Sequence, residues 1–130
     1  MNAAVIDTNV LIECFQCNRN ISEKISEFDR ILVPPAVLAE FKSGINVENR
    51  RGKKVQGQLD EFLDDPAVEI VPCTDETAEY YARIYRILKE NGTPLPTNDI
   101  WNASAALEHG ATVLSGDGHF SRVPMLKVAS

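Results

Sequence analysis

The chain has 130 residues, of which 44% are hydrophobic and 25% are charged, and its formal net charge is −6. These values are typical of one globular domain, which we expect to span residues 1–130, and they exclude disordered, collagen-like and coiled-coil chains. The negative charge argues against a broad phosphate-binding surface, but it is compatible with a local basic patch or with carboxylates that bind a metal.

The sequence predicts a cytoplasmic protein without disulfides. Its N-terminus lacks the charged and apolar regions of a signal peptide, and no apolar run approaches the ~20 residues that cross a bilayer. An odd number of cysteines disfavours a disulfide framework in such a chain. Cys14 and Cys17 form a C-x-x-C pair inside an expected helix rather than at its N-terminus. We therefore interpret them as core or surface thiols rather than as redox or zinc-binding residues.

Short β-like runs alternate with helical patterns, which is typical of an α/β domain with a parallel sheet. In the first third of the chain, Thr8 or Asn9 is expected to cap the first helix. Pro35 suits the first position of a later helix that Gly44 ends. In chain order, this part predicts a strand at 3–6, a helix at 9–17, a short helix at 22–28, a strand at 30–34 and a helix at 35–44.

Residues 45–57 have no apolar periodicity, so we expect a mobile segment there. The segment carries a basic cluster that consists of Arg50, Arg51, Lys53 and Lys54. Two interpretations of this cluster stay open, namely a contact for nucleic-acid phosphates and a solvated loop.

The second half of the chain continues the alternation of strand and helix. Thr74 is placed to cap a long helix, and one face of that helix is marked at helical spacing by Ala78, Ala82, Tyr85 and Leu88. In chain order, this half predicts a helix at 58–65, a strand at 67–72, helices at 75–92 and 97–110, and strands at 111–115 and 125–129. The whole pattern predicts a parallel sheet of four to five strands.

The predicted topology brings acids to one edge of this sheet. Asp7 follows the first strand and Asp117 follows the fourth. Asp99 begins the helix that leads to the fourth strand, and this helix must run antiparallel to the sheet. Because functional groups gather at the carboxyl ends of parallel strands, we expect these three acids to converge there. Glu40, in the helix after the second strand, is the fourth candidate.

Such a cluster of acids favours a divalent metal site. Several carboxylates at one edge repel one another, and no Lys or Arg lies within several residues of Asp7 or Asp99. An oxygen-rich pocket without clustered histidines suits Mg²⁺ or Mn²⁺ rather than zinc. Such an ion can activate water and stabilise an in-line displacement at phosphorus. The polar neighbours expected to hold waters or orient the acids are Thr8, Asn9, Asn98 and Ser115.

Each acid also has a purely structural interpretation. Asp7 fits a turn or a helix cap, Asp99 fits the first turn of a helix, and Asp117 fits a turn between glycines. Glu40 suits a solvent-facing position. His119 is a candidate general base, but a histidine in such a turn is more often a packing or surface residue. Taken together, four acids at one edge of the sheet are better explained by one metal site than by four unrelated structural roles.

Three stretches of the sequence resemble one family. VIDTNVLIE at the N-terminus, VLAEF around Glu40, and TNDIWNASAALEHGATVLSGDGHFSRVPMLKV at 97–128 resemble the PIN domain. Among PIN domains they are similar to the VapC-type toxins of bacterial toxin–antitoxin pairs. The resemblance covers the whole chain in order, with residues 45–75 matched in pattern only.

The resemblance implies a three-layer α/β/α sandwich and an endoribonuclease that depends on Mg²⁺ or Mn²⁺. It also implies a homodimer and an antitoxin partner whose tail covers the acidic pocket, often with an inserted basic residue. The metal-binding and catalytic acids that it implies are Asp7, Glu40, Asp99 and Asp117, with Ser115 as the supporting polar residue.

One departure from the family pattern concerns Asp117. It lies between Gly116 and Gly118, which predict a permissive backbone and a looser ligand. Asp7 and Asp99 are therefore the ligands expected to hold the metal most firmly.

Two alternatives belong to other classes of protein. Phosphoryl-handling domains of the receiver or haloacid-dehalogenase kind also set acids at strand ends. The dehalogenase kind has a second Asp two residues after the first, where this chain has Asn9. The receiver kind has a lysine at the end of its last strand, whereas Lys127 lies inside the final apolar run. The other alternative is a non-catalytic module that uses the acidic pocket only to bind a partner.

Overall fold

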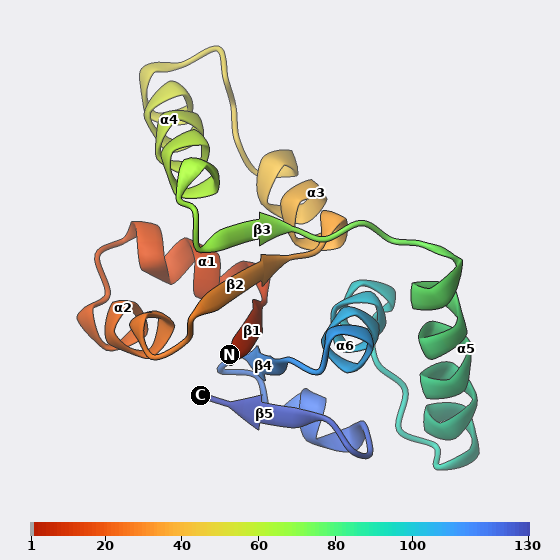
Figure 1. Ribbon diagram of the computed structural model, residues 1–130. Helices are drawn as coiled ribbons and strands as arrows, with labels where there is room; N and C mark the ends of the chain where they lie inside the picture. Colours follow the sequence, from red (N-terminus) through yellow and green to blue (C-terminus); the bar gives the residue numbers. More distant parts are fainter. Residues whose placement is uncertain (1) are drawn as a thin grey trace.

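Five strands form one sheet through the middle of the protein, and all neighbouring strands are parallel (Figure 1). The computed structural model describes residues 2–130. Across the sheet the strands lie in the order β3-β2-β1-β4-β5. Their bounds are β1 Ala3–Ile6, β2 Arg30–Val33, β3 Val68–Ile70, β4 Thr112–Leu114 and β5 Lys127–Ala129.

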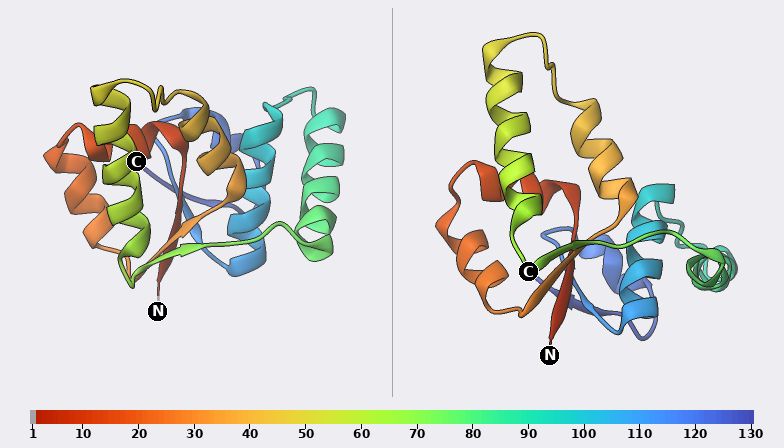
Figure 2. Two further views of the ribbon diagram at one scale, coloured as in Figure 1. Left: turned by 90° about the horizontal axis from the view of Figure 1, so that it is seen from above. Right: turned by 45° about the horizontal axis from the view of Figure 1, so that its top comes forward.

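Helices cover both faces of this sheet (Figure 2). They are α1 Thr8–Phe15, α2 Arg19–Ser26, α3 Pro35–Ser43, α4 Arg50–Asp64, α5 Asp75–Glu90, α6 Thr97–His109 and the 3-10 helix η1 Gly118–Arg122. Helices α1 to α4 pack on one face, and α5, α6 and η1 pack on the other. This arrangement confirms the predicted three-layer α/β/α sandwich. Within the described residues, no helix combines the length and apolar character that membrane crossing requires.

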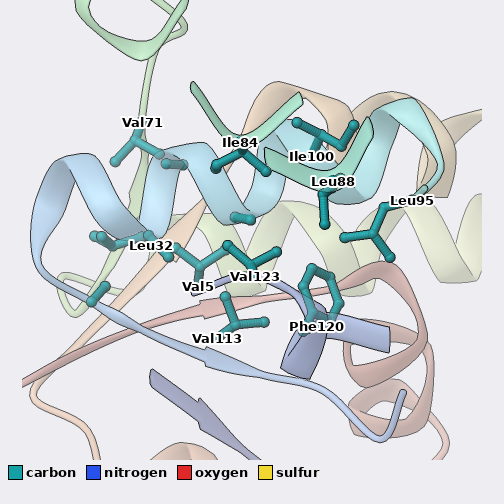
Figure 3. Packing of buried hydrophobic residues seen from close by; sticks show 14 residues of the cluster. Val5, Leu32, Val71, Ile84, Leu88, Leu95, Ile100, Val113, Phe120 and Val123 are labelled. Carbon is teal, nitrogen blue, oxygen red and sulfur yellow. The ribbon is translucent and has the colours of Figure 1, made fainter. Parts of the chain in front are cut away.

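Alternate residues of the central strand β1 point to opposite faces, as the two-residue period of a strand requires. Val5 packs with Val113 and Phe120 on the side of α5 and α6 (Figure 3). Ala4 and Ile6 pack on the side of α1 and α3. Because both faces of β1 are covered, its sequence is an uninterrupted apolar run instead of an alternating one.

The cap of the first helix differs from the prediction. Helix α1 begins at Thr8, and its N-cap is Asp7. Oδ1 of Asp7 accepts a hydrogen bond from the N–H of Val10 at 2.9 Å. The prediction that Thr8 or Asn9 caps α1 is therefore wrong, because the helix starts directly after the strand and the carboxylate already reaches its first turn.

The expected mobile segment at 45–57 is helical from Arg50 onwards, where α4 begins. Asn49 caps this helix by accepting a hydrogen bond from the N–H of Gly52 at 2.7 Å. Among the apolar residues of α4, those that pack on the core begin only at Val55. The first turn of α4 therefore has no apolar period that a sequence pattern can reveal. The basic cluster lies at the start of a helix and not in a loop.

The long helix α5 buries Leu88 of the predicted apolar face, but not the whole of that face. Its buried residues are Thr77, Ile84 and Leu88. Ala78 and Tyr85, which belong to the face marked by helical spacing, are exposed. The hydroxyl of Thr77 donates a hydrogen bond to Glu108 of α6 at 2.6 Å. A polar residue with a partner in α6 thus occupies the buried face, and apolar spacing alone does not identify it.

Two glycines of α4 differ in the space around them, and they test how closely α4 packs against the preceding loop. A Cβ at Gly52 would lie 1.6 Å from the carbonyl oxygen of Asn46, whereas a Cβ at Gly57 would meet nothing within 4 Å. We expect Gly52→Ala to lower the free energy of unfolding by about 1–3 kcal/mol, because the backbone must shift. Gly57→Ala should raise it by up to about 1 kcal/mol through higher helix propensity. Chemical denaturation measures both, and equal effects would contradict this packing of α4.

Candidate active site

Asp7 lies at the carboxyl end of the central strand, and both of its carboxylate oxygens are held. Oδ1 accepts the hydrogen bond from Val10, and Oδ2 accepts one from the hydroxyl of Ser115. The N–H of Asp7 donates to the carbonyl of Leu114 at 3.4 Å. Asp7 is only 7% exposed. A buried carboxylate is costly unless it is hydrogen-bonded, and the donors from Val10 and Ser115 replace the water that Asp7 loses.

Asp117 follows β4 and is connected to Asp7 through Ser115. The Ser115 hydroxyl, which donates to Asp7, accepts a hydrogen bond from the N–H of Asp117 at 2.9 Å. Oδ1 of Asp117 in turn accepts a hydrogen bond from the N–H of His119 at 2.9 Å and so caps η1. Neither of the glycines that flank Asp117 has a positive φ. The backbone and the side chain of Asp117 are therefore both anchored.

Asp99 is half-buried in the first turn of α6. Burial raises the pKa of its carboxyl above the usual value of 3.8, and the charges of Asp117, Asp7 and Glu40 raise it further. The nearby His119 lowers the same pKa. Mutual repulsion of this kind requires the acids to be close together. The structure thus brings the four acids to one edge of the sheet from four different segments of the chain.

Glu40 is exposed and reaches the site from α3. Its Oε2 accepts a hydrogen bond from the side-chain amide of Asn98 at 3.4 Å, which connects α3 to the start of α6. Glu40 lines a groove of about 560 Å³. The other predicted site residues that line this groove are Thr8, Asn9, Asn98 and Asp99. The groove therefore gives a ligand access to two of the four acids.

One group of side chains within residues 2–130 has the spacing of metal ligands. Ligand atoms of Asp99, Asp117 and His119 all lie within 4.8 Å of one another. Two carboxylates and an imidazole are donors that divalent cations accept. After burial, the charges of Asp117, Asp7 and Glu40 also raise the pKa of Asp99, so negative charge gathers at this place. The residues present therefore fit a divalent metal. Asp7 is not a member of this group, and both of its oxygens already accept hydrogen bonds.

His119 is the member of the group that the sequence pattern did not connect with metal binding. Its Nδ1 lies 3.0 Å from Oδ1 of Asp117. The signal available in the sequence was its interval of two residues from Asp117, which the tight turn of η1 brings side by side.

Two members of the basic cluster line a second groove beside the acids. This groove of about 520 Å³ is formed by residues of α1, α3 and α4, and it includes Glu40, Arg51 and Lys54. Arg50 and Lys53 are exposed but do not line it. Because Glu40 lines both grooves, half of the basic cluster shares a groove with one of the four acids.

The C-x-x-C pair has the properties of ordinary thiols. Cys14 lies in the last turn of α1, and Cys17 follows the end of that helix. Burial raises the pKa of the Cys14 thiol, and the neighbouring Cys17 raises it further. Because the thiolate is the reactive form, this environment disfavours redox chemistry at Cys14.

Comparison with known proteins assigns the chain to a family. The sequence model of the PIN-domain family matches residues 4–126. The chain belongs to the PIN-domain family. Ribonuclease VapC2 of Rickettsia felis is 26% identical over 127 residues, which cover 94% of this chain and 92% of that protein. Ribonuclease VapC5 of Mycobacterium tuberculosis is 28% identical over 121 residues, which cover 92% of this chain and 86% of that protein.

A solved structure shows the same fold. The crystal structure of VapBC2 from Rickettsia felis, bound to a DNA fragment from its promoter, contains a chain that superimposes on this PIN domain with a TM-score of 0.86. The superposition covers 98% of this chain and 97% of that chain, at 23% identity. The comparisons confirm both the predicted PIN-like fold and the resemblance to VapC-type proteins.

The variant Asp99→Asn tests the electrostatic cost of the acid cluster. Because folding raises the pKa of Asp99, its stabilising contribution is full below the unfolded value of 3.8 and is lost as the pH rises through the folded pKa. In the metal-free protein we therefore expect the uncharged Asn to raise Tm by a few degrees near neutral pH. This gain should shrink as the pH falls towards the unfolded value.

Thermal unfolding in the presence of a chelator measures this effect across the acidic range. Asp60→Asn is the matched control, since Asp60 is an exposed acid of α4. A destabilising effect of Asp99→Asn at neutral pH would contradict the assignment of repulsion to this site.

Proposed function

We propose that this PIN-domain protein is a metal-dependent endoribonuclease that hydrolyses RNA phosphodiesters and serves as the toxin of a toxin–antitoxin pair. The observation that carries the proposal is the convergence of four acids at one edge of the sheet, where burial and then the charges of the other three acids raise the pKa of Asp99. Membership of the PIN-domain family and similarity to two proteins named as ribonucleases support it. We also propose that the chain acts as one domain and that it acts in the cytoplasm.

The proposed cofactor is Mg²⁺ or Mn²⁺, since hard divalent cations prefer oxygen ligands. Asp99 and Asp117 are proposed as direct ligands because their oxygens are close enough to share one ion. Asp7 and Glu40 are proposed to complete the site, directly or through water. When bound, such an ion supplies an activated water and stabilises the charge that develops at phosphorus.

The polar residues around the acids hold them in place for this chemistry. Ser115 connects Asp7 to Asp117 through its single hydroxyl, and Asn98 positions Glu40. Such fixed partners reduce the reorganisation that a reaction at the site would otherwise require. Thr8 and Asn9 line the groove, where their side chains can hold waters or a bound substrate.

The basic cluster is proposed as the RNA contact. Arg51 and Lys54 line the groove that also contains Glu40, so a phosphate chain held there would pass beside Glu40. Arg50 and Lys53 extend this positive charge along the exposed start of α4. A protein with net charge −6 needs such a local patch to hold a polyanion.

The proposed protein partner is a cognate antitoxin, and the proposed assembly includes a homodimer. The VapC-type resemblance supports the antitoxin, as does the structural likeness to a chain of the VapBC2 complex. The acid cluster would attract a basic side chain inserted by such a partner, because opposite charges at an interface guide association.

Mn²⁺ binding and RNA cleavage together test the proposed activity. We expect millimolar Mn²⁺ to raise Tm of the parent protein, because an ion that binds only the folded state stabilises it. Asp99→Asn should remove this rise and reduce RNA cleavage by about 100-fold or more, since it removes one charged ligand. A fluorescent single-stranded RNA, followed with and without chelator, measures the cleavage.

Asp60→Asn, on the exposed surface of α4, is the control and should keep both the Mn²⁺ response and the cleavage. A parent protein that binds Mn²⁺ but cuts no RNA would instead favour the non-catalytic module. Cleavage that persists undiminished in Asp99→Asn would refute the proposed site.

The double variant Arg51→Ala, Lys54→Ala tests the RNA contact. We expect weaker binding of single-stranded RNA and a salt dependence whose slope falls by about 0.7 for each phosphate that the variant no longer neutralises. Fluorescence anisotropy at several salt concentrations measures both. Lys89→Ala, an exposed lysine in the last turn of α5, should change neither. An unchanged salt slope in the double variant would exclude these residues from the RNA contact.

A further inference from the structure

His119 is held at the acid cluster by the same oxygen that caps its helix. Oδ1 of Asp117 accepts a hydrogen bond from the N–H of His119 at 2.9 Å, and it also lies 3.0 Å from Nδ1 of the ring. Both the backbone and the imidazole of His119 are therefore fixed relative to Asp117. The side chain is nonetheless 52% exposed, so an ion from solvent can reach it.

The position of the imidazole matches the dimensions of a metal site. Its ligand atom and those of Asp99 and Asp117 lie within 4.8 Å of one another. Two ligands on opposite sides of a small divalent ion, each about 2.1 Å from it, are about 4 Å apart. Small side-chain rotations are therefore enough for the three groups to share one ion.

We propose that His119 supplies a nitrogen ligand to the metal, so that the site favours first-row transition ions such as Mn²⁺ over Mg²⁺. The proposal rests on the proposed function, because it concerns the same ion. Mg²⁺ prefers oxygen ligands and gives up its waters reluctantly, whereas transition ions accept imidazole. Asp117 offers a carboxylate to the same ion, and its Oδ1 lies 3.0 Å from Nδ1 of the ring.

The chain offers a matched control, because it has only two histidines. His109 lies at the end of α6, with its Nε2 3.7 Å from Glu108. His109 is not a member of the group with metal-ligand spacing. His119→Phe and His109→Phe each remove one imidazole and keep a planar ring.

Electron paramagnetic resonance of bound Mn²⁺ tests the proposal without reference to catalysis. In the parent protein and in His109→Phe we expect pulsed spectra that show coupling to a directly bound ¹⁴N nucleus. In His119→Phe this coupling should disappear. The Kd for Mn²⁺ should rise about tenfold or more in this variant, whereas the Kd for Mg²⁺, measured by competition, should change much less.

The possible failures are distinguishable. A parent spectrum without ¹⁴N coupling, together with metal-dependent RNA cleavage, would overturn the role of His119 and leave the proposed function intact. An equal change in the Kd values for Mn²⁺ and Mg²⁺ would also overturn the proposed preference. A parent protein that binds neither ion would refute both this inference and the proposed cofactor.

Discussion

The carboxylate of Asp7 is the constraint on which the rest of the site depends. One oxygen holds the first turn of α1 through Val10, and the other holds the end of β4 through Ser115. A buried carboxylate is tolerated only because both of these donors are present. The same chain of hydrogen bonds continues from Ser115 to Asp117 and then to His119. The apolar residues on either side of Asp7 keep this arrangement rigid, because they form the central strand and the helix packed against it.

Bringing the acids together raises the electrostatic free energy of the folded protein. The raised pKa of Asp99 is the local sign of that cost, and it arises from burial and from three other carboxylates. The packing of the strands and helices stabilises the fold, and this stabilisation offsets the repulsion at one edge of the sheet. The proposed divalent ion would offset it, and the imidazole of His119 would add a ligand with different metal preferences from those of the acids.

Under the proposed function, the uneven distribution of charge lets an acidic protein hold a polyanion. The first five residues of α4 hold the basic cluster, and two members of the cluster share a groove with Glu40. Glu40 of α3 lines this groove as well as the groove that Asp99 lines, so it connects the cations to the acid cluster. Under the proposed function, the cations hold the phosphate chain while the acids hold the metal, and neither task requires a positive net charge.

The sequence by itself determined the strands, the parallel sheet and the edge at which Asp7, Asp99 and Asp117 meet. These features follow from apolar periodicity and from the rule that carboxyl ends of parallel strands share one edge, both of which are local or topological. Only the tertiary structure decided that Asp7 is both cap and acceptor for Ser115, and that His119 joins the acids. These contacts depend on the register of β1 against β4 and on the turn after β4. Partners as far apart in the chain as Asp7 and Ser115 leave no periodic trace in the sequence.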